Sequence, residues 1–152
     1  MRIIVVILII FSSCNMKNSD NTVKKNLLEL EAIQKILTKQ QECWNNGDID
    51  GFMKGYWNSE DLIFTSLKHK PAYGWKATLE RYKNSYPTIS NMGKLKFEIL
   101  NTSLTSERKA KLKGKWELIR EEDHPNGLFW LELEKFDENW LITKDSTISN
   151  GL

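Results

Sequence analysis

Hydrophobic positions in the first half of the chain recur at the spacing of helices. Over residues 25–44 they fall alternately three and four positions apart, which is one face of an amphipathic helix. Asp48 is an N-cap candidate for a short second helix, and a loop containing Pro71 precedes a third helix that begins near Trp75 and stops before Pro87. The face of the first helix consists of Leu30, Ile33, Leu37, Gln40 and Trp44.

The second half of the chain changes to the two-residue period of β-strands. Apolar residues alternate with charged ones over residues 95–99, 110–118 and 129–134, and residues 140–149 form a last candidate strand. A short strand candidate, residues 62–67, lies between the second and third helices. The order helix, helix, strand, helix and four strands predicts an α+β fold, with an antiparallel sheet packed against helices on one face.

The first residues have the composition of an export signal. Arg2 is followed by an apolar run over residues 3–11, which at about 1.5 Å per residue spans about half of a hydrocarbon core of about 30 Å. Small serines at 12–13 precede Cys14, an arrangement that resembles a bacterial lipobox. We therefore expect residues 1–13 to be a lipoprotein signal peptide and Cys14 to be lipidated. An ordinary secretory signal, with Cys14 incidental, is the alternative.

This N-terminus implies a protein tethered to a membrane. Residues 14–25 are polar and predict a flexible tether, and residues 26–150 predict one compact domain. Stable anchoring of a weakly charged domain depends on acyl chains, each buried methylene contributing about 0.8 kcal/mol. The expected location is the bacterial cell envelope, periplasmic or at the outer surface, with Cys14 as the contact to the membrane.

Composition narrows the classes of function. The 152 residues contain 22 Lys and Arg and 20 Asp and Glu, for a net charge of +2, which argues against a strongly basic nucleic-acid binder. Two cysteines cannot form a disulfide framework. No cluster has the spacing of metal ligands and no glycine-rich phosphate loop occurs, so we expect no metal and no cofactor.

Five blocks in the domain occur in an order that is specific when taken together. The blocks are WNNGDIDGFMKGYWNSEDLIF (44–64), GWKATLERYKNSYP (74–87), MGKLKF (92–97), GKWEL (114–118) and GLFWLELEKFDENWLITKDST (127–147). They resemble the nuclear transport factor 2-like superfamily, and within it the SnoaL-like and DUF4440 group related to ketosteroid isomerase. The resemblance implies a curved antiparallel sheet wrapped around three N-terminal helices as a cone with an apolar pocket. Because many relatives dimerise through the outer sheet face, it also implies a homodimer.

The ketosteroid isomerase residues, carried across one by one, argue against steroid isomerisation. The tyrosine of the first helix falls near Gln40, and the base falls at Ser66, which cannot remove a carbon-bound proton at neutral pH. The second acid falls near Glu132, which the strand alternation places outside the core unless a bulge shifts the register. Closer relatives carry Asp-His-Thr-Ser where this chain has Asp-Ser-Thr-Ile at 145–148, so the aspartate is kept and the histidine is not.

Asp145 is the candidate catalytic residue. If it faces the pocket, burial raises its pKa and makes it a base or a hydrogen-bond donor; the alternative is a structural carboxylate. Tyr and Trp carry polar groups that need partners when buried, so several of them on packed faces suggest a lined cavity rather than a plain core. The expected ligand-binding residues are Trp44, Tyr56, Trp57, Ser66, Trp75, Tyr82, Trp116, Trp130 and Glu132.

Three hypotheses of function follow. The first is a lipid-anchored envelope protein whose pocket binds a small, largely apolar molecule without committed catalysis. The second is a lyase, isomerase or cyclase that uses Asp145. The third is an interaction module that docks a partner protein, or a second copy of itself, on the outer face of the sheet. We expect a small-molecule ligand and no nucleic-acid partner.

Overall fold

The computed structural model describes residues 14–67 and 69–150. The predicted signal peptide, residues 1–13, lies outside them. The described elements are α1 (Cys14–Asn45), α2 (Ile49–Met53), β1 (Ile63–Ser66), β2 (His69–Tyr73), α3 (Trp75–Ser85), α4 (Ile89–Met92), β3 (Lys94–Ser106), β4 (Lys109–Ile119), β5 (Asn126–Phe136) and β6 (Asn139–Asn150).

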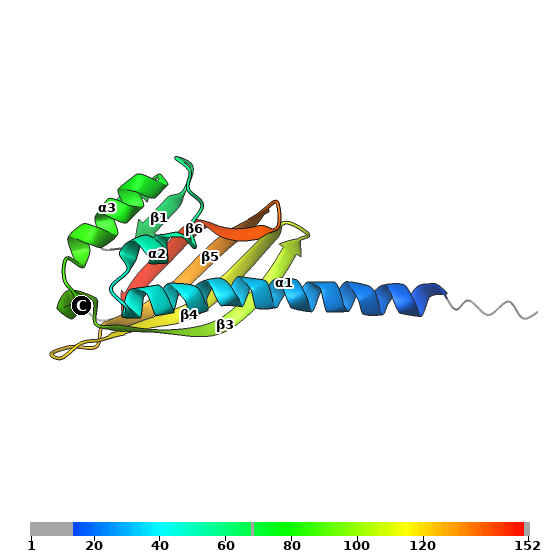
Figure 1. The fold of residues 1–152 in the computed structure, drawn as a ribbon, viewed down its shortest axis with the longest axis horizontal. Coiled ribbons are helices and arrows are strands. Elements are labelled where there is room, and N and C mark those ends of the chain that lie inside the picture. Colours follow the sequence, from blue (N-terminus) through cyan, green and yellow to red (C-terminus); the bar gives the residue numbers. More distant parts are fainter. Residues whose placement is uncertain (1–13, 68, 151–152) are drawn as a thin grey trace, which may run out of the picture.

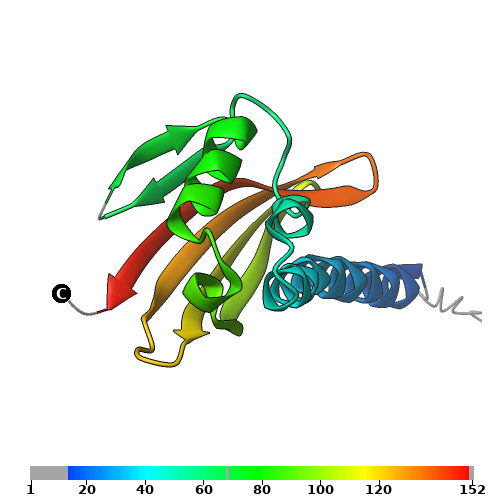
Figure 2. The same cartoon turned by 60° about the vertical axis from the view of Figure 1, so that its left-hand side comes forward.

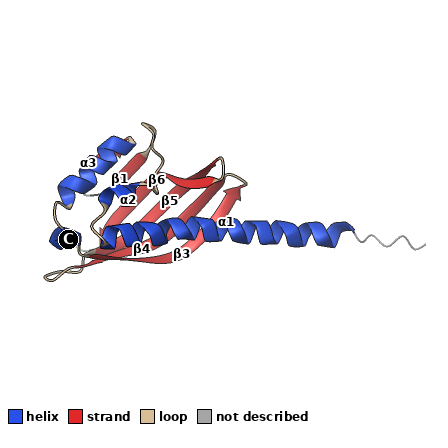
Figure 3. Cartoon of the chain, viewed as in Figure 1, coloured by secondary structure: helices blue, strands red, loops and turns tan. Residues whose placement is uncertain are grey.

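A curved six-stranded sheet forms one layer, and the helices lie on its inner side (Figures 1 and 2). The strand order is β2-β1-β6-β5-β4-β3. α1 runs beside β3, and α3 covers the β1 side, so helices and sheet enclose the interior of a cone (Figure 3). The α+β class and the curved sheet wrapped around N-terminal helices, both predicted from the sequence, are confirmed.

The sheet is mixed, whereas the strand pattern predicted a purely antiparallel one. β1 and β6 pair in parallel, with Phe64 opposite Asp145. β2 occupies the segment around Pro71 that the sequence predicted as a loop. Proline is tolerated there because β2 is an edge strand, where a missing N–H breaks no interior hydrogen bond. Alternation within a strand says nothing about which neighbour it pairs with, so direction was not predictable.

α1 begins earlier than the hydrophobic pattern indicates. The segment 14–25, predicted as a flexible tether, forms the first turns of this helix, which projects past the sheet (Figure 1). A helix that is packed further along extends at little cost, because each added residue forms one more hydrogen bond. Within the described part of the chain, no helix is long and apolar enough to cross a membrane.

The predicted helical faces are the buried ones. Ile33 and Leu37 of α1 are buried against the sheet, as the spacing indicated. Asp48 caps α2, where its carboxylate accepts a hydrogen bond from the Gly51 N–H at 2.7 Å. These contacts fix the two helices over the inner face of the sheet and so shape the site described next.

Candidate functional site

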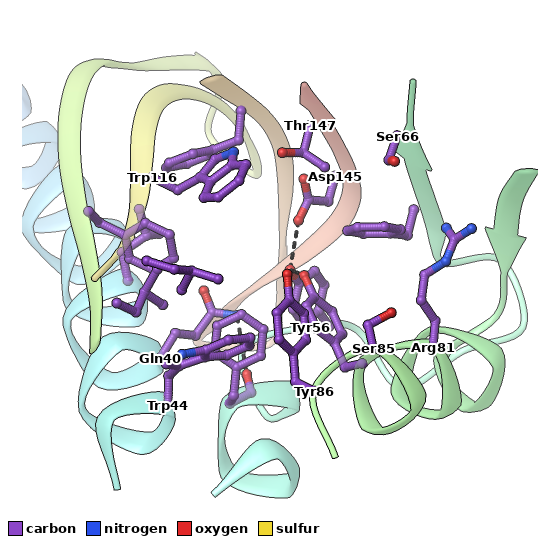
Figure 4. Close-up of a pocket in the computed structure, with 18 of the residues that line it drawn as sticks. Gln40, Trp44, Tyr56, Ser66, Arg81, Ser85, Tyr86, Trp116, Asp145 and Thr147 are labelled. Carbon is purple, nitrogen blue, oxygen red and sulfur yellow. Dashed lines mark hydrogen bonds between the residues drawn. The ribbon is translucent and has the colours of Figure 1, made fainter. Parts of the chain in front are cut away.

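A cavity of about 330 Å³ lies inside the cone. Its walls come from α1, α2 and α3 on one side and from β1 and β3 to β6 on the other (Figure 4). Ser85 and Ser149 line it and are exposed, so the cavity reaches solvent at the end of α3 and of β6. This volume is near the lower limit of sites for small molecules, about 300 Å³, which suits a ligand of one or two rings.

Part of the predicted site comes together here. The side chains share the inner surface of the cone although they lie up to a hundred positions apart in the chain. The predicted residues that line the cavity are Trp44, Tyr56, Ser66, Tyr82, Trp116 and Asp145.

Two of the predicted aromatic residues lie elsewhere. Trp57 stacks on Phe136, with ring centroids 4.9 Å apart. Trp75 donates from Nε1 to the carbonyl oxygen of Met53 at 3.0 Å, which ties the start of α3 to α2. Both residues stabilise contacts between elements and do not line the cavity.

Two more predicted residues lie on the outer face of the sheet. Trp130 is 38% exposed, and the Nζ of Lys113 lies 5.6 Å from its ring centroid. Glu132 is exposed and pairs with Lys144 at 3.6 Å. A register shift follows Glu132 in the pairing of β5 with β6, yet the side chain still points outward because Leu131 and Leu133 on either side are buried.

Asp145 is the buried acid of the cavity. It sits on β6 and is 6% exposed, and its Oδ2 accepts a hydrogen bond from the Tyr56 hydroxyl at 2.7 Å (Figure 4). Among the described residues, Oδ1 is buried and has no hydrogen-bond partner. Burial raises the pKa of Asp145 to about 7, and the hydrogen bond from Tyr56 opposes that rise. The carboxyl can therefore exchange a proton near neutral pH.

Two tyrosines extend this contact into a chain. The hydroxyls of Tyr56 and Tyr82 lie 3.2 Å apart. Since Tyr56 directs its proton to Asp145, Tyr82 is the donor of the second bond. Burial, followed by the charge of Asp145, raises the pKa of both phenols well above the ordinary value, so they remain neutral. The chain Tyr82–Tyr56–Asp145 is one polar strip on an otherwise aromatic wall.

The tryptophans of the cavity present ring surfaces rather than hydrogen-bond donors. Trp44 donates from Nε1 to the carbonyl oxygen of Met92, and Trp116 donates to that of Ile148, both at 3.2 Å. Trp44 also meets Tyr86 edge to face, with centroids 4.8 Å apart. The indole N–H groups are thus satisfied by the backbone, and the rings are left to contact a ligand through their apolar surfaces.

The position that carries the first-helix tyrosine in ketosteroid isomerase is occupied here by a buried amide. Gln40 donates from Nε2 to the carbonyl oxygen of Phe52 at 3.2 Å, a bond between α1 and α2. Ser66, at the position of the base, lines the cavity as a half-buried hydroxyl. Neither residue supplies an acid or a base, which agrees with the argument from sequence against steroid isomerisation.

Sequence reasoning missed two arginines that line the cavity. Arg81 of α3 extends toward β1, with its guanidinium carbon 5.3 Å from the ring centroid of Phe64. It donates from Nη2 to the carbonyl oxygen of Lys70, and its Nη1 is buried without a hydrogen-bond partner in the described part of the chain. Arginines beside an aromatic helical face look solvent-exposed in a sequence, because Arg is mostly exposed in folded proteins, and no local pattern marked Arg81 as different.

The second arginine is already neutralised. Arg120 donates from Nε to Oδ1 of Asp123 at 2.6 Å and from Nη2 to Oδ2 at 2.7 Å. Its Nη1 donates to the carbonyl oxygen of Asn91 at 3.2 Å.

The described residues contain no candidate metal centre. Residues 14–67 and 69–150 have no group of three His, Cys, Asp or Glu side chains placed to hold an ion.

One solved structure is similar in both sequence and fold. It is an NTF-2 like protein of unknown function from Shewanella oneidensis, 41% identical, with a TM-score of 0.74. The match covers 78% of this chain and 97% of that one. No family model matches the chain, and no curated protein does.

Two more distant structures share the fold alone. A ketosteroid isomerase-like protein from Erwinia carotovora is 17% identical with a TM-score of 0.68, over 82% of this chain and 98% of that one. An NTF2-like protein with a cystatin-like fold from Novosphingobium aromaticivorans is 10% identical with a TM-score of 0.67, over 90% and 91%. The N-terminal helices and the curved sheet are thus common to all three.

Proposed function

Since the chain belongs to the NTF2-like family, we propose that it binds a small, largely apolar molecule, most simply an aromatic one, inside the cone. The observation that carries the proposal is the cavity of about 330 Å³, walled by aromatic rings whose own polar atoms are satisfied. Such a surface gains free energy by covering apolar ligand area, about 25 cal/mol per Å².

The polar strip gives the ligand an orientation. Oδ1 of Asp145 has no partner among the described residues, so a hydroxyl or carbonyl on the ligand can complete its hydrogen bonding. An unpartnered buried oxygen costs free energy, and a ligand group placed there recovers part of it. We therefore expect ring systems with one polar substituent to bind more tightly than plain hydrocarbons.

Calorimetric titration with 2-naphthol tests the proposal. Ser85→Trp places an indole at the exposed mouth of the cavity and should abolish the heat of binding. The matched control is Asn84→Trp, an exposed neighbour on α3 that does not line the cavity and should bind as the wild type does. If neither 2-naphthol nor indole and quinoline analogues bind the wild type, the proposal is wrong.

A second candidate function, acid–base catalysis, is favoured by the state of Asp145. A buried carboxyl with a pKa of about 7 is suited to take a proton from a carbon beside a ligand carbonyl and return it to another atom of that ligand. This is the chemistry of an isomerase, lyase or cyclase. Asp145→Asn should then reduce turnover by about a hundredfold or more while ligand binding is kept; unchanged turnover would exclude it.

We also propose that Cys14 anchors the protein in the cell envelope. The support is the sequence of residues 1–14, and α1 would act as a spacer between membrane and cone. Labelling with a radioactive or alkyne fatty acid in a bacterial host should modify the wild type and leave Cys14→Ser unlabelled and soluble. An unlabelled wild-type chain in the soluble fraction would contradict the anchor.

A further inference from the structure

The cavity contains one positive charge that the protein does not balance. Arg81 and Arg120 both line it, and Arg120 is held by both carboxylate oxygens of Asp123. Arg81 has no ion pair with any carboxylate of the described residues. It donates to the carbonyl oxygen of Lys70, and its guanidinium lies over the ring of Phe64. One of the two guanidinium groups is thus available to a ligand.

Asp145 does not supply the missing negative charge. It is the one carboxylate among the lining residues, and its Oδ2 is engaged with Tyr56. Burial keeps it protonated up to about neutral pH. At and below that pH, the charge that faces the cavity is therefore positive.

The free donor of Arg81 indicates what kind of anion fits. Nη1 is buried without a partner in the described part of the chain, and leaving a charged donor unsatisfied costs more than leaving a neutral one. One N–H of Nη2 already donates to Lys70, and the unpartnered Nη1 is left to bind an anion of single charge such as a carboxylate. The hydroxyls of Ser66 and Ser85 line the same cavity and can add neutral bonds.

We propose that the ligand is a small aromatic carboxylate, with its anionic group bound by Arg81 and its ring body against the tryptophan and tyrosine wall. The inference rests on the proposed function, since it names the class of molecule that the same cavity takes. Arg81 is then the residue that sets specificity for charge, and the aromatic wall supplies affinity that does not depend on charge.

The test compares two probes of one shape, 2-naphthoate and its neutral amide, 2-naphthamide, by calorimetry. The wild type should bind the carboxylate about tenfold or more tightly than the amide, as expected for a charge-assisted hydrogen bond. Arg81→Gln should remove that preference by lowering carboxylate affinity about tenfold or more and amide affinity much less, and Arg81→Lys should restore part of it. The control is Arg108→Gln, which also removes a guanidinium that donates to a backbone carbonyl but lies outside the cavity.

The outcomes separate the two proposals. Equal affinity of the wild type for carboxylate and amide overturns the carboxylate inference while the proposed binding function stands, and this readout requires no variant to fold. An unaltered carboxylate preference in Arg81→Gln, with the wild-type melting temperature, overturns it as well. If neither probe binds the wild type, the carboxylate inference fails, and the titration with 2-naphthol decides separately whether the proposed binding function stands.

Discussion

The two ends of the cone share α1 and strands β4 to β6, but one end is filled and the other is hollow. The filled end is defined by Ile33, Leu112, Leu133 and Ile142, which are between 0% and 2% exposed. The open end, to which α3 also contributes, is defined by Tyr56, Tyr82, Arg81 and Asp145, which surround the cavity. Both ends have the same two layers, helices on one side and sheet on the other. The shapes and polar atoms of the side chains therefore decide which end is closely packed.

The difference shows what a polar atom does to packing. Branched aliphatic side chains have no hydrogen-bonding atoms. Their rotamers are therefore chosen by steric fit alone, and they pack closely. Tyr56 is held by the carboxylate of Asp145, and Trp116 by the carbonyl of Ile148, so their rings cannot rotate into the gap. Hydrogen bonds at the edge of the cavity therefore keep it open.

The largest expected effect concerns Asp145 and the dependence of stability on pH. Because its pKa is raised from 3.8 to about 7, the folded state binds more protons than the unfolded state between these values. The free energy of unfolding then decreases as pH rises through this window and levels off above it. Asp145→Asn removes this decrease, so relative to the variant the wild type should lose on the order of 4 kcal/mol between about pH 4 and pH 8.

Urea denaturation of the two proteins across that pH range measures the difference. Asp50→Asn is the control, because Asp50 is exposed and its ion pair with Lys83 is on the surface. Parallel pH profiles of wild type and Asp145→Asn would show that the open end does not bury a carboxyl as described.

Shortening a side chain should cost more at the filled end than at the cavity wall. Leu133→Ala deletes packed methyl groups and should lower the free energy of unfolding by about 3 kcal/mol. Leu131→Ala, two residues earlier on β5, enlarges a space that already exists and should cost about 2 kcal/mol. Chemical denaturation measures both, and equal losses would mean that the two ends are packed alike.

Removing the hydroxyl of Tyr56 should have an intermediate effect. Tyr56→Phe deletes the hydrogen bond that lowers the pKa of Asp145, so that pKa should rise further, with a loss of about 1–2 kcal/mol in stability. Carbon-detected NMR titration of the Asp145 carboxyl gives the pKa directly. Tyr86→Phe, at the same wall but outside the hydrogen-bond chain, should leave it unchanged, and a shift there would contradict the chain.

The smallest effect is expected on the outer face of the sheet. Trp130→Ala removes an exposed ring beside Lys113, and the cation–π contact contributes less than about 1 kcal/mol. Binding of 2-naphthol should be unchanged, because Trp130 does not line the cavity.

We further propose that the outer face of the sheet forms a homodimer interface. Analytical ultracentrifugation should then show a dimer for the wild type and a weaker dimer for Trp130→Ala. A monomeric wild type would exclude this interface.

Much of the fold could be predicted because local signals were strong. The spacing of Ile33 and Leu37, the cap at Asp48 and the alternation of β3 to β6 each follow from the few residues concerned. β2 was missed because a proline such as Pro71 normally argues against a strand. At the edge of a sheet the missing N–H carries no such penalty. The parallel partner of β1 was missed because pairing joins residues about eighty positions apart, such as Phe64 and Asp145.

The candidate site was predictable only in part, for a related reason. Asp145 stood out because the resemblance keeps an aspartate at this position, whereas its burial was only a condition of the sequence argument and is shown by the structure. Trp57 and Trp75 looked equally suitable, yet their rings serve contacts between elements. Arg81 looked like a surface residue, because a sequence shows that a residue is charged but does not show whether any carboxylate lies near it.

By itself, the sequence determined most of the elements and the apolar face of each of those, because these depend on short-range periodicity. Only the tertiary structure decided which rings enclose a space, which arginine is paired and which strands are neighbours. These are relations between distant segments, and their free energies arise when a curved sheet closes over its helices.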